Sequence, residues 1–135
     1  MPRVDAALLL IRIASGLALL YHGCGILFGA FGGPGPEKFA AVIHAPGTIG
    51  YLVGLAQVAG GLAILIGLFI RIGAICAAIV MLGAIFLVHL PHGFDINQGG
   101  FEYALTQLLI AVALILAGAG RYSVATRLPS TLKNL

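Results

Sequence analysis

The 135-residue sequence is 61% hydrophobic and only 8% charged, with 20 glycines and no tryptophan. A water-soluble domain could not bury so large an apolar excess, so the composition predicts an all-α integral membrane protein. The formal net charge of +3 comes from basic residues scattered singly along the chain, a pattern that indicates topology signals and no nucleic-acid partner. Membrane-spanning helices need about 20 residues each, so this length allows about four of them in a single domain over residues 1–135.

The first apolar stretch predicts a transmembrane helix over residues 6–29. It lacks a small-residue cleavage site followed by polar residues, so we interpret it as a retained helix and not as a signal peptide. Residues 30–50 contain repeated glycine and proline and are expected to form a loop. Within this loop Pro36 is placed as a first-turn residue, and Phe39, Val42 and Ile43 recur at helical spacing, which predicts a short helix lying on the membrane surface.

The apolar stretch over residues 51–90 is too long for one crossing, because a straight helix of that length would reach about 60 Å. Arg71 is the charge near its midpoint, so we predict a hairpin of helices over residues 51–69 and 72–90 with Arg71 at the turn. A last helix is predicted over residues 101–118, after a pair of glycines. The sequence therefore predicts a four-helix membrane bundle.

The basic residues of the loops predict the orientation of this bundle. One side carries Arg3, Arg71, Arg121, Arg127 and Lys133, whereas Lys38 falls on the other. Because cytoplasmic loops carry the excess of lysine and arginine, both termini are predicted to be cytoplasmic and the short surface helix to lie in the first outer loop.

A layer of polar residues is predicted near the outer face. With about 1.5 Å of rise per helical residue, His22, Gln57 and His89 reach nearly the same depth, and Glu102 and Tyr103 enter the last helix at this boundary. Polar groups in a membrane face a bundle interior or a cavity, so this layer predicts an outward-opening polar pocket. Structural interpretations stay open, because Glu102 also suits the first turn of a helix and Tyr103 an aromatic anchor at the interface.

Arg12 is a further candidate on the first helix. It falls on one stripe with Ser15, Leu19 and His22, and this stripe should face the bundle. Arg12 either extends toward cytoplasmic phosphates or pairs inside the bundle, and no acidic residue lies at its depth.

Metal and haem binding are less strongly indicated. His89 and His92 are three residues apart, which is compatible with two metal ligands, but Pro91 interrupts the helix between them. His22 and His89 lie at a depth that would allow bis-histidine haem ligation, although ordinary hydrogen bonding of these histidines explains the pattern equally. Cys24 and Cys76 are predicted to lie roughly 20 Å apart in depth, too far for a disulfide.

Three segments resemble the DoxX family of small four-helix membrane proteins. They are RIASGLALLYHGCGILFG at residues 12–29, GGLAILIGLFIR at residues 60–71, and the last segment at residues 93–123, whose GGFEYAL and GAGRYS runs are the most specific. The resemblance implies a DoxX-like bundle in the bacterial or archaeal cytoplasmic (inner) membrane, in a family named for subunits linked to quinone-dependent sulfur oxidation. One departure is Gln57, at a position where the family often carries glutamate.

These observations predict a quinone-linked oxidoreductase component or accessory subunit. Its outer pocket, formed by His22, Gln57, His89 and Glu102, would hold a quinone head group or a small substrate, since histidine and carboxylate suit proton exchange. The expected partners are the lipid bilayer and either other membrane oxidoreductase subunits or a second copy of the chain. The alternative is a non-catalytic membrane scaffold or a transport protein for a small solute or lipid.

Overall fold

The computed structural model describes residues 1–132 and 135, and the described chain folds into α-helices joined by short turns. The α-helices are α1 (Pro2–Phe28), α2 (Gly35–Val42), α3 (Gly47–Ile66), α4 (Ile70–Ala84) and α5 (Glu102–Ala117). The shorter turns are η1 (Ala30–Gly32), the π-helical η2 (Ile85–His89), η3 (Leu90–His92), η4 (Ile96–Gln98) and η5 (Val124–Arg127). No β-strand occurs among the described residues, and the predicted all-α class is confirmed.

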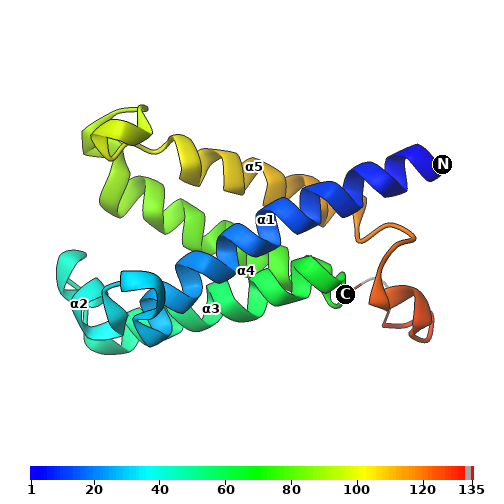
Figure 1. The fold of residues 1–135 in the computed structure, drawn as a ribbon, viewed down its shortest axis with the longest axis horizontal. Coiled ribbons are helices and arrows are strands. Elements are labelled where there is room, and N and C mark those ends of the chain that lie inside the picture. Colours follow the sequence, from blue (N-terminus) through cyan, green and yellow to red (C-terminus); the bar gives the residue numbers. More distant parts are fainter. Residues whose placement is uncertain (133–134) are drawn as a thin grey trace.

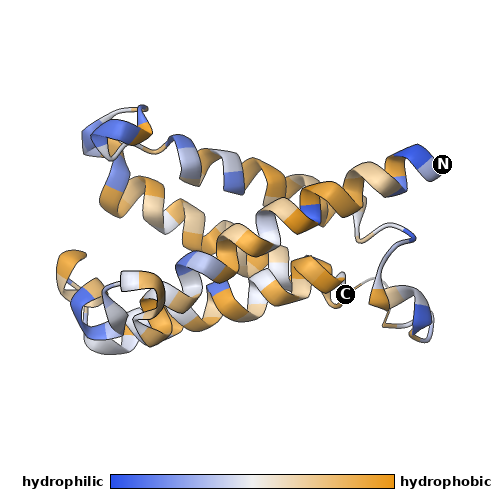
Figure 2. Cartoon of the chain, viewed as in Figure 1, coloured by the Kyte–Doolittle hydropathy of each residue, from blue (hydrophilic) through white to orange (hydrophobic). Residues whose placement is uncertain are grey.

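Three helical segments of the described chain are long and apolar enough to cross a membrane: Pro2–Phe28, Gly47–Ile66 and Ile70–His92. α5 is also apolar but has only 16 residues, which is about 24 Å of helix against a hydrocarbon core of about 30 Å. Figure 2 shows hydrophobic residues along the lengths of the helices and hydrophilic residues concentrated toward the two ends. This distribution is typical of helices that lie in a bilayer.

The helix boundaries differ from the sequence expectation where proline intervenes. α1 begins at Pro2, because a first-turn proline lacks an N–H that the helix would leave unpaired in any case. The helix expected over residues 72–90 is α-helical only to Ala84 and then continues as the π-helical turn η2. Pro91 follows this turn and cannot donate to a carbonyl of the preceding turn, so the regular α-helical pattern is not maintained up to it.

The long helices pack as two antiparallel pairs, α1 with α3 and α4 with α5, joined by contacts between α3 and α4. The start of α1 and the segment after α5 lie at one end of the bundle, and we call this end the clamp end. α2 and residues 85–101 lie at the other end, the cavity end, toward which the two pairs diverge (Figure 1). Arg3, Arg71, Arg121 and Arg127 belong to clamp-end segments, whereas Lys38 belongs to α2 and Lys133 lies outside the described residues.

Glycines allow α1 and α3 to approach closely. A Cβ added at Gly16 would lie 2.8 Å from Leu65 Cβ and 2.9 Å from the Gly61 carbonyl oxygen. One added at Gly61 would lie 3.0 Å from Leu19 Cβ. Close approach of this kind is how membrane helices gain packing energy, because lipid chains provide no hydrophobic drive for helices to associate.

The clamp end is held by the guanidinium of Arg12, a side chain that is only 1% exposed. Its Nε and Nη2 donate to the Ile64 and Leu65 carbonyls at 2.9 and 3.0 Å, in the last turn of α3. Its Nη1 donates to the Ala119 and Tyr122 carbonyls at 2.7 and 2.8 Å, in the segment after α5. The last carbonyls of a helix lack intrahelical partners and carry partial negative charge, so they suit a buried cation. We call this set of four hydrogen bonds the Arg12 clamp.

Three neighbouring features support the Arg12 clamp. Gly67 ends α3 with a φ of 70°, and a Cβ there would lie 2.6 Å from Arg12 Nη2, so only glycine suits both the conformation and the space. The Gly67 carbonyl accepts from the Ala125 amide at 3.1 Å, which docks η5 on the α3–α4 turn. At the start of α1, the buried Asp5 carboxylate accepts from the Arg121 amide at 2.9 Å.

Alanine substitutions at two helical glycines should change stability in opposite directions. Gly16→Ala should lower the free energy of unfolding by about 1 to 3 kcal/mol, because its Cβ meets α3. Gly83→Ala has nothing within 4 Å of the added Cβ and should raise stability by about 0.5 to 1 kcal/mol through helix propensity. Unfolding in mild detergent, followed by circular dichroism, measures both; equal effects would contradict the close α1–α3 contact.

Loss of the Arg12 clamp should destabilise the protein strongly. Arg12→Met removes all four donors and should lower the free energy of unfolding by about 2 to 4 kcal/mol. Arg12→Lys keeps the charge but cannot reach carbonyls of two segments at once, so it should recover only part of this loss. The exposed Arg3 provides the matched control, and Arg3→Met should have an effect within about 0.5 kcal/mol. Comparable losses for Arg3→Met and Arg12→Met would refute the clamp.

Candidate functional site

A cavity of about 410 Å³ lies at the cavity end, between the two helix pairs. Its wall is largely apolar and comes from α1, α2, α3, α4, α5 and the residues between α4 and α5. Four of the residues expected at the site line it, namely His22 on α1, Gln57 on α3, His89 on η2 and Tyr103 on α5. A mainly apolar cavity with a few convergent polar groups, in the volume range of about 300 to 1,000 Å³, is the usual form of a small-molecule site.

Gln57 and Tyr103 carry unsatisfied polar atoms in this wall. Gln57 is 4% exposed, and its Oε1 is buried without a hydrogen-bond partner among the described residues. The Tyr103 hydroxyl is likewise buried and finds no partner in the part of the chain that the structure describes. An unsatisfied buried polar atom destabilises a fold by about 1 to 3 kcal/mol, so two of them beside one cavity point to a ligand that supplies their partners.

The two histidines of the cavity are held differently. The His22 ring lies 4.9 Å from the Tyr103 ring at an angle of 46°, so α1 and α5 meet through these aromatic side chains. His89 has its Nδ1 2.6 Å from the Gly99 carbonyl oxygen. A carbonyl only accepts, so Nδ1 carries the proton, and the neutral ring has Nε2 as its acceptor.

Glu102 lies next to the cavity but is not among the residues that line it. It occupies the first turn of α5, and its Oε2 accepts from the Ile96 amide at 3.3 Å. This placement stabilises the helix N-terminus and orders the preceding loop.

Arg12 lies away from the cavity, at the clamp end, and all of its hydrogen bonds given above go to backbone carbonyls. Between it and the cavity, Ser15 on α1 donates to Gln107 Oε1 on α5 at 2.6 Å, and both side chains are buried. The predicted stripe on α1 therefore faces the bundle interior. Arg12 lies at the clamp end of this stripe, whereas His22 lies at the cavity end.

Two apolar residues of the site were assigned elsewhere by the sequence argument. Phe39 of α2 and Ile43, which follows the last residue of α2, were expected in a short helix on the membrane surface; in the structure α2 packs on α3 and both residues line the cavity. α2 is reached through left-handed backbone at Phe31 (φ 56°) and left through His44 (φ 53°). Their i, i+4 spacing was the available signal, but the sequence does not show onto which surface the helix folds.

Metal-ligand groups are sparse in the described part of the chain, where no cluster of three or more His, Cys, Asp or Glu side chains occurs. His92, the second metal candidate, is exposed and has its Nδ1 3.1 Å from the Val88 carbonyl oxygen. His22 and His89, the haem candidates, share the cavity wall with Gln57 and Tyr103. Cys24 and Cys76 are free thiols.

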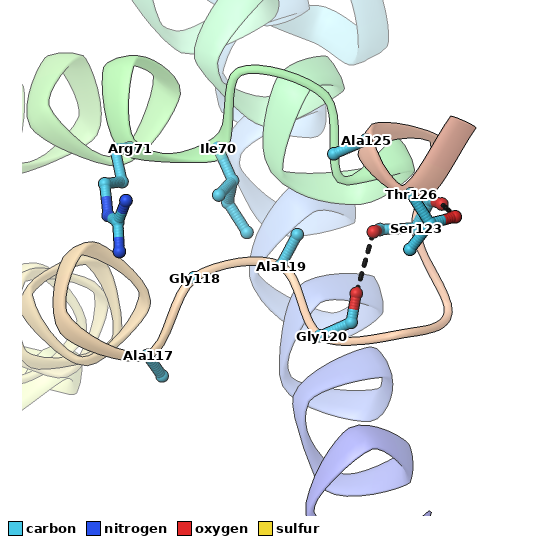
Figure 3. Close-up of a pocket in the computed structure, with 9 residues that line it drawn as sticks. All are labelled: Ile70, Arg71, Ala117, Gly118, Ala119, Gly120, Ser123, Ala125 and Thr126. Atoms are coloured by element: carbon cyan, nitrogen blue, oxygen red, sulfur yellow. Dashed lines mark hydrogen bonds between the residues drawn. The ribbon is translucent and has the colours of Figure 1, made fainter. Parts of the chain in front are cut away.

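A second, smaller cavity of about 230 Å³ lies at the clamp end (Figure 3). It lies between Arg71 at the start of α4 and the turn that follows α5. Its polar side chains are engaged: Arg71 Nε donates to the Ile115 carbonyl at 2.9 Å, and Ser123 Oγ donates to the Gly120 carbonyl at 2.8 Å. The unsatisfied Gln57 and Tyr103 atoms therefore make the larger cavity the stronger candidate.

Comparison with known proteins found one relative and one family. A protein of Bacillus subtilis (strain 168) named "Putative oxidoreductase CatD" is 30% identical over 111 residues, which cover 82% of this chain and 78% of that protein. No solved structure matches the chain. The model of the DoxX family matches residues 7–90. This match covers more than half of the sequence, and it shows that the chain, a multi-pass membrane protein, belongs to the DoxX family.

Proposed function

We propose that this protein is a membrane component of a quinone-linked oxidoreductase and that its larger cavity binds the quinone head group. The observation that carries the proposal is a largely apolar cavity whose wall includes Gln57 and Tyr103, two side chains that each have a buried polar atom without a partner among the described residues. The oxidoreductase named in the relative from Bacillus subtilis supports the general class of activity.

The cavity residues fit a quinone in both chemistry and size. A quinone ring is flat and apolar with oxygen atoms at its edge, so it needs an apolar cavity with hydrogen-bonding groups at a few points. The Tyr103 hydroxyl can donate to a carbonyl oxygen, and Gln57 Oε1 can accept from a hydroxyl. The volume of about 410 Å³ accommodates a ligand of this class.

Each polar residue then has a distinct task. Gln57 and Tyr103 bind and orient the head group, whereas His22 and His89 can receive or deliver protons beside it. Phe39 of α2 and the following Ile43 cover the cavity and exclude water. A bound quinone supplies the exchange of two electrons and two protons, and the sequence has no haem-attachment or iron–sulfur motif, so the electrons pass to or from a partner subunit.

The same proposal includes a four-span topology in the bacterial or archaeal cytoplasmic membrane. α5 crosses as the fourth span, and its 16 residues are extended by flanking Phe101 and Gly118. The clamp end, with Arg3, Arg71, Arg121 and Arg127, is cytoplasmic, and the cavity end faces outward. The cavity is therefore accessible to a quinone from the outer leaflet.

Protein purified in mild detergent should carry quinone in about equimolar amount, measured by mass spectrometry of its lipid extract. The double variant Gln57→Met/Tyr103→Phe removes the two unsatisfied polar atoms and should lower the quinone content at least about fivefold. Because those atoms have no partners in the ligand-free protein, the variant should unfold at the same temperature as the parent or higher once both proteins have been stripped of quinone.

The matched control is Gln98→Met/Tyr122→Phe, which makes the same chemical changes at exposed positions outside the cavity. It should keep the full quinone content. A parent protein that carries no quinone, and that gains none when quinone is added, would favour the scaffold or transport function instead.

The orientation can be tested with single-cysteine variants in a Cys24→Ala/Cys76→Ala background. On intact cells, a membrane-impermeant thiol reagent should label Lys38→Cys at once and Arg127→Cys only after permeabilisation. The reverse labelling pattern would place the cavity on the cytoplasmic side and contradict the proposed topology.

A further inference from the structure

α3 and α4 are in close contact near their turn and separate toward the larger cavity. A Cβ added at Gly60 of α3 would lie 2.9 Å from the Gly73 carbonyl oxygen and 3.8 Å from Cys76 Cβ, both on α4. Gly83 follows Cys76 by seven residues and therefore lies on the same face of α4. A Cβ added at Gly83 nevertheless meets nothing within 4 Å, and Gly83 lines the cavity. The two helices thus leave an opening beside Gly83.

Apolar residues border this opening on both helices. We call them the α3–α4 groove, and they are Ile49 and Val53 of α3, Ile79 and Gly83 of α4, and Leu87 of η2. Ile79 and Leu87 line the cavity and are also 64% and 71% exposed on the surface of the protein. Residues with both properties mark the place where a cavity reaches the surface. The cavity therefore opens sideways between α3 and α4.

The groove lies at a depth where its surroundings are hydrocarbon. Ile79 precedes His89 by ten residues, which is about 15 Å along the helix. The groove residues of α4 and η2 fall inside the segment Ile70–His92, and those of α3 inside Gly47–Ile66, and both segments are long and apolar enough to cross a membrane. A sideways opening at this depth leads into lipid and not into water.

The polar side chains of the cavity lie away from the groove. His22 and Tyr103 belong to α1 and α5, and their rings lie 4.9 Å apart. Gln57 belongs to α3, but its Cβ lies 2.8 Å from the position of a Cβ at Gly23, so this side chain is directed toward α1. A ligand whose polar head lies among these groups would extend its apolar part along the α3–α4 groove.

We infer that the cavity takes a ligand with a long hydrocarbon tail, and that this tail leaves through the α3–α4 groove into the bilayer. The inference rests on the proposed quinone site and goes beyond it by naming the class of quinone, one that resides in the membrane, and the route of its tail. Gly83 keeps this route open because it has no side chain to fill the space between the helices.

Binding of two quinones with matched rings tests the route. They are tetramethyl-benzoquinone and its trimethyl-decyl analogue, in which a decyl tail replaces one methyl group. The full chain in lipid nanodiscs is mixed with empty nanodiscs and either compound, the two kinds of disc are captured separately, and mass spectrometry measures the quinone in each. The excess over empty nanodiscs is the protein-bound quinone, and the parent protein should bind both compounds.

Gly83→Phe should block the tail and spare the ring. Protein-bound decyl compound should fall at least about fivefold, while the tetramethyl compound should change less than about twofold, because the added side chain clashes only with the tail. Gly83→Ala fills little of the opening and should retain both compounds. Ala59→Phe is the matched control, since it adds the same ring at an exposed position of α3 outside the cavity and should change neither.

Photolabelling of the parent protein locates the tail directly and does not depend on the folding of a variant. A trimethyl-benzoquinone that carries a diazirine in its tail, close to the ring, is irradiated in the nanodiscs, and mass spectrometry identifies the labelled residues. The adducts should fall on the α3–α4 groove. Adducts on α1 or α5 would show that the tail leaves on the opposite side and would overturn the inference.

The outcomes separate this inference from the proposed function. If neither quinone binds the parent above the empty-nanodisc level, the quinone site itself is wrong. If the tetramethyl compound binds and the decyl compound does not, or if a folded Gly83→Phe weakens neither or both equally, the site stands and the tail route is refuted. A disulfide-linked dimer of Leu87→Cys in a Cys24→Ala/Cys76→Ala background, without tail adducts on the groove, would show that a second copy covers this side and would also overturn the inference.

Discussion

The architecture depends on one buried cation that is bound by backbone. Arg12 lies within the apolar part of α1, where an unpaired guanidinium would be strongly unfavourable. The four carbonyls of the Arg12 clamp satisfy it, and in return it satisfies the end of α3 and the segment after α5. Because these carbonyls come from elements far apart in the sequence, the clamp can form only when α1, α3 and the end of α5 have come together. It therefore fixes the register of the bundle as well as its stability.

A bundle fixed at one end can remain open at the other. Glycine contacts bring α1 and α3 together along their length, whereas the two helix pairs meet near the clamp and diverge at the cavity end (Figure 1). Along the α1–α5 boundary the contacts change from the Arg12 clamp to the Ser15–Gln107 hydrogen bond and then to the His22–Tyr103 ring contact. The polar stripe of α1 thus holds the bundle together at the clamp end and lines the cavity at the other end. One face of α1 therefore contributes both to stability and to the candidate site.

The coarse fold and several residues of the cavity wall could be predicted from the sequence, and the reason is physical. Helices in a membrane are nearly straight, so counting residues from each end placed His22, Gln57 and His89 at one depth, and these residues do line one cavity. The partners of Arg12 could not be read in this way, because backbone carbonyls have no sequence signature. The position of α2 depends on left-handed backbone at Phe31 and His44. This conformation is uncommon for residues other than glycine, so it could not be predicted from these residue types. Glu102 is next to Tyr103 of the cavity wall, but its carboxylate accepts from the loop amide of Ile96.

The departure at Gln57 is consistent with this arrangement of charges. A buried carboxylate at this position would need a nearby cation, and the residues lining the cavity include no lysine or arginine. Arg12 could not supply that charge, since it is committed to the Arg12 clamp at the opposite end. A neutral amide provides both an acceptor oxygen and an NH2 donor at this position without requiring a counter-charge, and an unsatisfied amide oxygen is only moderately unfavourable. Gln57 therefore leaves the cavity wall without a carboxylate, in a bundle whose buried cation is already used to hold the helices together.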